Sequence, residues 1–82
     1  MNTTYEVRVK RDKENEVGVA IGTVPTLQFA RHIARKSSGL VRIFTKAEGS
    51  DGDISIIRID HYFAGEKISE KVWLEITRLM NK

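Results

Sequence analysis

Cysteine is absent from the 82-residue chain, and proline occurs once, at position 25. Without cysteine the chain forms neither disulfide bonds nor thiolate metal sites, which is typical of a protein of the reducing cytoplasm. Long hydrophobic runs are missing as well. The longest stretch without a charged residue, Val17 to Ala30, has 14 residues and includes two glycines and the proline. Such a stretch is too short to cross a bilayer. Residues 1–4 contain no basic or apolar segment, so no signal peptide is expected.

The composition is that of an ordinary globular protein, with 40% apolar and 30% charged residues. A chain of this length is enough for one domain, expected to span residues 1–82. The net charge is +3, and it is unevenly distributed. Residues 1–47 contain nine Lys and Arg against four Asp and Glu, whereas residues 48–82 contain five against seven. The basic first half favours an acidic partner.

Alternation of apolar and polar residues predicts four strands. Two of them, over 5–10 and 17–21, flank a charged turn at 12–15 and form a predicted hairpin. The other two, over 40–45 and 54–60, flank a turn rich in Gly and Asp at 48–53. The segment 61–67 fits either a strand end or a loop.

Two helices are predicted from apolar residues that recur on one side at 100° per residue, over 25–37 and 69–81. Pro25 suits a first helical turn, and Ser69 can cap the second helix. The apolar side of the first helix consists of Leu27, Phe29, Ala30, Ile33 and Ala34, and that of the second of Val72, Trp73, Ile76, Leu79 and Met80.

The predicted fold is therefore a small α+β domain of ββαββα order. Each helix has one apolar side to bury, so we expect both helices on one face of a four-stranded, largely antiparallel sheet. The other face of that sheet would then lie open to solvent.

An arginine lies between two β-branched residues in three of the four predicted strands: Arg8, Arg42 and Arg58. Side chains alternate across a sheet, so the three arginines are expected on the open face if their neighbours point to the helices. The same face would carry Glu6, Lys10, Phe44, Ile56 and Asp60. Arginine binds carboxylates and phosphates through paired hydrogen bonds. Alternatively, this is an ordinary solvated face on which Glu6 and Asp60 neutralise the arginines.

Two further surfaces are candidates for partner binding. The polar side of the first helix carries Arg31, His32, Arg35 and Lys36, which fits either a phosphate backbone or a plain solvated helix. In the predicted geometry it points away from the three arginines. Leu74 lies among the polar residues of the second helix, as an isolated exposed leucine or as part of a contact surface.

Groups that support catalysis are scarce. Asp60 and His61 are adjacent in a strand and so face opposite sides, which prevents them from acting as a catalytic pair. Asp51 and Asp53 belong to a turn, and no calcium-binding loop follows them. A small open sheet also offers little concavity for a substrate. We therefore expect no enzyme, catalytic residue, metal, cofactor or small-molecule substrate.

The predicted function is that of a non-catalytic binding or regulatory protein in the cytoplasm. Its expected partner is an acidic protein or a nucleoprotein complex, met by Arg8, Arg42 and Arg58 together with Phe44 and Lys10; the alternative is direct binding of DNA or RNA. An uncovered sheet edge would also permit a homodimer. In its proportions, a single ββαββα-like module of some 80 residues, the chain resembles small phage or plasmid inhibitors, including some anti-CRISPR proteins. That resemblance covers no specific residue and implies an inhibitory binding role.

Overall fold

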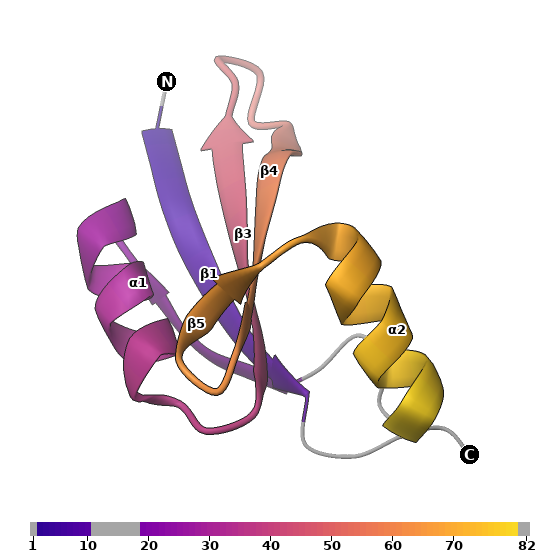
Figure 1. Ribbon diagram of the computed structural model, residues 1–82. Coiled ribbons are helices and arrows are strands. Elements are labelled where there is room, and N and C mark those ends of the chain that lie inside the picture. Colours follow the sequence, from indigo (N-terminus) through magenta and orange to yellow (C-terminus); the bar gives the residue numbers. More distant parts are fainter. Residues whose placement is uncertain (1, 11–18, 81–82) are drawn as a thin grey trace.

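The computed structural model describes residues 2–10 and 19–80 and has an α+β fold (Figure 1). The elements follow one another as β1 (Asn2–Lys10), β2 (Val19–Val24), α1 (Leu27–Lys36), β3 (Leu40–Glu48), β4 (Ile54–Phe63), β5 (Glu66–Ile68) and α2 (Glu70–Met80). Neither described helix is long and apolar enough to span a membrane.

The five strands form one antiparallel sheet in the order β2-β1-β3-β4-β5. Both predicted hairpins are confirmed as the pairs β1–β2 and β3–β4, although the charged turn at 12–15 lies outside the described residues. The prediction of four strands is wrong in number. The unassigned segment 61–67 contains the end of β4 and most of a short fifth strand, so the order of elements is ββαβββα.

A two-residue turn joins β4 to β5. Ala64 and Gly65 both have positive φ, 51° and 84°, as a type I′ hairpin turn requires. The turn lies against the end of α1, where a Cβ atom added to Gly65 would come within 2.6 Å of the Arg35 carbonyl oxygen. Glycine at position 65 therefore allows both the backbone conformation and the close approach.

The main core lies between α1 and one face of the sheet, here called the α1 face. It consists of Val7, Val9, Ala30, Ala34, Val41, Ile43 and Tyr62. Cross-strand partners in a sheet carry their side chains on the same face. The pairs Val7–Ile43 and Val41–Tyr62 therefore place the odd-numbered residues of β1 and β3 beside α1.

The second helix contacts the opposite face, which contradicts the prediction that both helices share one side. Arg8 pairs with Arg42 and Arg42 with His61, so these three define the other side of the sheet, here called the Arg42 face. Trp73 of α2 lies against this face, with its ring centroid 5.2 Å from that of His61. The chain reaches this side because β5 reverses it at the sheet edge before α2 begins (Figure 1).

Both helices are confirmed: α1 begins two residues later and ends one residue earlier than predicted, and α2 begins one residue later, while position 81 lies outside the described residues. Pro25 precedes the cap residue of α1, so its predicted place in the first helical turn is wrong. Thr26 caps α1, its hydroxyl accepting a hydrogen bond from the Phe29 backbone N–H at 3.2 Å. Ser69 caps α2 as predicted and accepts from the Val72 N–H at 3.2 Å. The apolar sides are much less buried than predicted: only the two alanines of α1 and Trp73 of α2 are buried, while Phe29 is 55% exposed.

Candidate binding groove

A layer of cations and aromatic rings covers the middle of the Arg42 face. The guanidinium carbons of Arg8 and Arg42 lie 5.9 and 5.2 Å from the centroid of the Phe44 ring. Glu6 forms ion pairs with Arg8 and with Lys46, the latter at 3.0 Å between Nζ and Oε2. Arg8 and Arg42 thus share this face as predicted, but Phe44 is buried beneath them. Little of the Phe44 side chain therefore reaches solvent.

Arg42 also holds α2 in place. Its guanidinium carbon lies 4.9 Å from the Trp73 ring centroid, so the side chain contacts two aromatic rings. Burial, and secondarily the positive charge of Arg8, lowers the pKa of Arg42. Burial also lowers the pKa of His61, with a further contribution from Arg42. Arg42 is half-buried and has a structural role, whereas the alternation predicts an arginine that is fully exposed on the open face.

Arg58 lies on the α1 face, and its predicted position beside Arg8 and Arg42 is wrong. There it contacts the buried carboxylate of Asp60, with Nη2 at 3.0 Å from Oδ1. Lys67 of β5 approaches the same oxygen at 3.3 Å. The other oxygen of Asp60, Oδ2, is buried without a hydrogen-bond partner among the described residues. The two cations therefore provide most of the compensation for this buried charge.

The register between β3 and β4 explains this correction. Ile43 pairs with Asp60, so the even-numbered residues at the end of β4 share the α1 face with the odd-numbered residues of β3. A bulge then leaves Ile57 without a partner, because Thr45 pairs with Arg58 and Lys46 with Ile56. Ile56 is thereby brought onto the Arg42 face, where the alternation also predicts it.

The first half of β4 leaves a run of isoleucines exposed. The exposed fractions are 67%, 54%, 62% and 44% for Ile54, Ile56, Ile57 and Ile59. Three of them lie on the Arg42 face, because they pair with even-numbered residues of β3: Ile54 with Glu48, Ile56 with Lys46 and Ile59 with Phe44. Single exposed apolar residues are common, but a continuous apolar strip marks an interaction site more often than chance.

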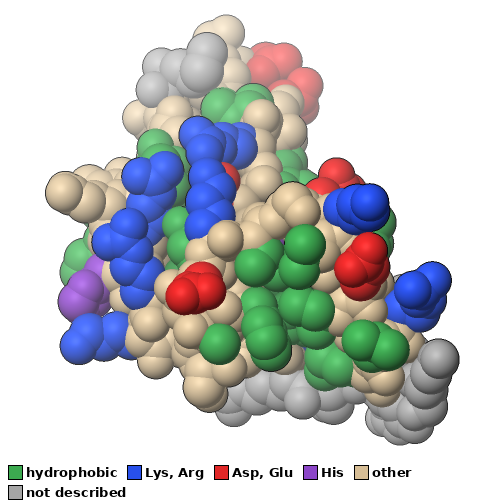
Figure 2. Space-filling view, in the orientation of Figure 1, with side chains coloured by type: hydrophobic (Ala, Val, Ile, Leu, Met, Phe, Trp, Pro, Cys, Tyr) green, Lys and Arg blue, Asp and Glu red, His purple; other side chains and the backbone are tan. Residues whose placement is uncertain are grey.

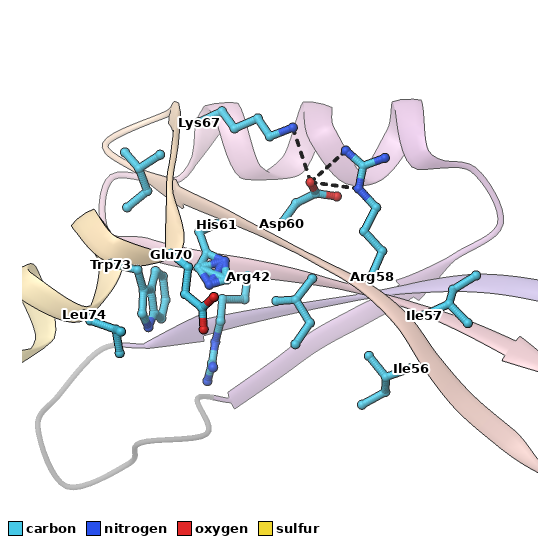
Figure 3. Close-up of a pocket in the computed structure, with 12 residues that line it drawn as sticks. Arg42, Ile56, Ile57, Arg58, Asp60, His61, Lys67, Glu70, Trp73 and Leu74 are labelled. Carbon is cyan, nitrogen blue, oxygen red and sulfur yellow. Dashed lines mark hydrogen bonds and ion pairs between the residues drawn. The ribbon is translucent and has the colours of Figure 1, made fainter.

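A groove of about 480 Å³ follows this part of β4 and wraps around its outer edge (Figure 3). On the Arg42 face it is lined by Ile56, Ile59 and, from α2, Trp73 and Leu74; on the α1 face it is lined by Arg58, Asp60 and Lys67. Figure 3 shows Arg58, Asp60 and Lys67 on one side of the β4 ribbon, and Arg42 and Ile56 on the other. The groove therefore combines an apolar wall with a basic one.

The other residues that were predicted to contact a partner lie in several separate parts of the structure. Lys10 pairs with the buried Leu40 and is itself buried, so its predicted exposure on the open face is wrong. Leu74 is 59% exposed and lines the groove. Arg35 and Lys36 are exposed at the end of α1, and Arg31 is half-buried. Lys and Arg side chains gather over α1 and the neighbouring strands (Figure 2), on the side of the sheet to which Arg58 belongs.

Sequence reasoning missed the isoleucines as a possible site, and it missed Lys67 altogether. The signal for the isoleucines was the segment 54–59, which carries four of them with one serine and one arginine. Such a run also fits a buried strand, because the sequence does not show that β4 lies beside an edge. Lys67 belongs to the segment that had no assignment.

The chain matches no protein-family model, no curated protein and no solved structure. Among the described residues, no three His, Cys, Asp or Glu side chains gather into a group that could hold a metal ion.

Proposed function

We propose that this protein is a non-catalytic binding protein, and that the groove at β4 binds a protein partner. The observation that carries the proposal is the run of four exposed isoleucines beside the groove. Burying one such side chain fully contributes about 1.5–3 kcal/mol. Covering four that are roughly half exposed would thus contribute about 3–6 kcal/mol, before the cost of association.

The charge around the groove favours a partner with acidic residues, alone or in a nucleoprotein complex. Arg58 and Lys67 share the single carboxylate of Asp60, which leaves a net positive charge on that wall. About half of each cationic side chain is exposed, 49% and 52%. An acidic side chain of the partner could therefore reach both cations. The groove thus replaces the three-arginine surface as the proposed contact, and an inhibitory role would follow if it blocks the partner's own site.

Site-specific cross-linking tests this function. A photoreactive amino acid replaces Ile57 in the groove or, as the matched control, Ile21, an isoleucine that is 43% exposed on β2 at the other edge of the sheet. We expect a protein adduct from position 57 in nuclease-treated cell extract, and none from position 21. An excess of wild-type protein without the photoreactive group should compete for the partner and suppress the adduct. An excess of the Ile56→Lys variant, which is altered in the groove, should not suppress it. Equal cross-linking at both positions would count against the groove.

Direct nucleic-acid binding is the second candidate, favoured by one observation. Arg58 and Lys67 lie on the side of the sheet that carries α1, where they join Arg31, Arg35 and Lys36 of that helix. If all five cations neutralise duplex phosphates, the logarithm of the association constant should fall against that of the salt concentration with a slope of about −4.5. A gel-shift titration with DNA and RNA at several salt concentrations measures this slope. No retardation at low salt excludes this candidate.

A further inference from the structure

The outer edge of β4 is open beside the groove. β5 pairs only with His61, Tyr62 and Phe63, so within residues 2–10 and 19–80 no strand pairs with the outer edge of Ile54–Asp60. At about 3.3 Å per residue, this edge is about 23 Å long. An edge strand presents unpaired backbone N–H and C=O groups that can bind another strand.

This edge has few of the features that protect sheet edges from pairing. Proteins usually protect an exposed edge with lysine, proline, bulges or charges that point inward. Segment 54–60 contains neither lysine nor proline. Its one inward-pointing charge, the buried Asp60, is neutralised by ion pairs with Arg58 and Lys67. The bulge at Ile57 divides the pairing of β4 with β3 into two ladders and does not cover the outer edge of β4.

The position beside this edge is the one that β5 leaves when the chain turns into α2. β5 ends at Ile68, and Ser69 caps the helix that follows. A strand added along Ile54–Asp60 would therefore lie in line with β5, in the same place in the sheet. The groove at this point is lined from both faces, as such a strand would require, because its side chains alternate between the two.

The two faces of the open edge differ in chemistry. On the Arg42 face, an added strand would meet Ile56, Ile59 and Leu74. On the α1 face, it would meet Arg58 and Lys67. Apolar side chains suit the first face and carboxylates the second.

We infer that the groove binds an extended segment of a partner protein by β-strand addition, and that this segment alternates apolar and acidic residues. The inference rests on the proposed function and specifies how the groove is filled. Backbone hydrogen bonds to β4 hold the segment, and its alternating side chains determine which partner fits. A second copy of the chain suits the edge less well, because antiparallel pairing of Ile54–Asp60 with itself brings two copies of Arg58 near each other.

A synthetic peptide tests this mode of binding directly. The probe is a seven-residue peptide of alternating Glu and Val with blocked ends, titrated to millimolar concentration into the ¹⁵N-labelled protein. We expect amide shifts confined to 54–60 and its neighbours. Methylation of alternate peptide nitrogens, and replacement of Glu by Lys, should each weaken binding more than tenfold. Ile56→Lys should weaken it similarly, whereas Ile21→Lys on β2 should not, with both variants folded by circular dichroism.

Other results of these experiments would each contradict a separate part of the inference. Methylation of alternate nitrogens can block one edge of the peptide strand or the other. If the peptides methylated on each edge both bind as tightly as the unmodified one, strand addition is wrong while the groove remains a binding site. Equal binding of the Lys peptide contradicts the acidic specificity. A wild-type dimer that Ile56→Lys converts to a monomer in sedimentation shows that the edge pairs with a second copy. Absence of peptide binding overturns strand addition, and the cross-linking from position 57 decides separately whether the groove binds a protein. If oligothymidylate displaces the peptide, the groove binds nucleic acid and the proposal of a protein partner is wrong.

Discussion

Replacing Trp73 with alanine should destabilise the protein more than any other single change in α2. Trp73 is 5% exposed and is the only buried residue of this helix. A buried aromatic side chain of this kind removes about 200 Å² from water, worth about 5 kcal/mol at 25 cal/mol per Å². Partial burial in the unfolded chain reduces this by about 10–40%. We therefore expect Trp73→Ala to lower the free energy of unfolding by about 3–4.5 kcal/mol, in the range measured for such substitutions.

That loss is a large part of the about 4–12 kcal/mol expected for 82 residues. Urea denaturation followed by far-ultraviolet circular dichroism measures it, since the variant lacks its only tryptophan. The matched control is Leu74→Ala, because Leu74 is the neighbouring residue and is 59% exposed. It should change stability by less than about 0.5 kcal/mol. Hydrogen exchange should also show α2 opening first in Trp73→Ala. Equal losses for the two variants would refute the role of Trp73 as the anchor of α2.

Three further predictions concern stability. Gly65→Ala should lower the stability of the protein more than Gly52→Ala does. Both glycines have positive φ, but only a Cβ at Gly65 meets a backbone oxygen, at 2.6 Å. Thermal unfolding of the two variants checks this, and equal losses of stability would contradict it. Arg42→Glu should destabilise by about 1–2 kcal/mol in urea titration because it removes contacts with two aromatic rings, so a change within half a kcal/mol would show that the contacts contribute nothing. The pKa of His61 is lowered by burial, so the unfolded chain binds that proton more readily and stability should fall as the pH drops below about 6.5. Urea denaturation on either side of that pH should show a smaller loss in His61→Gln, and an unchanged loss would rule out His61 as the cause.

Local signals in the sequence were sufficient for β1 to β4 and for both helices, but not for the three-residue strand β5. The two-residue alternation of β1 and β3, the 100° periodicity of both helices and the cap at Ser69 depend on neighbouring residues only. The same holds for the turn at 49–53, where Gly52 adopts the positive φ of 87° that glycine permits. These interactions are made within a few residues of the chain, so they can be predicted without knowledge of the fold.

The site depended on relations that the sequence does not contain. The alternation around Arg58 is the same as that around Arg42, yet the two residues face opposite sides. Alternation fixes which residues share a face within one strand, but pairing between strands decides which of the two faces that is. In β4 the pairing of Ile43 with Asp60 places Asp60 and Arg58 on the α1 face, and the bulge at Ile57 then places Ile56 on the Arg42 face.

The helices illustrate the same distinction. An apolar side predicts that a helix is buried and does not say against which face of the sheet. The short strand β5 takes α2 to the Arg42 face, where only Trp73 is buried. Because β5 pairs with three residues of β4, the rest of that strand remains an open edge with its isoleucines exposed. The sequence by itself determined four of the five strands, both helices and the cap at Ser69 through short-range interactions, whereas the groove exists only because long-range pairing decides where the sheet ends.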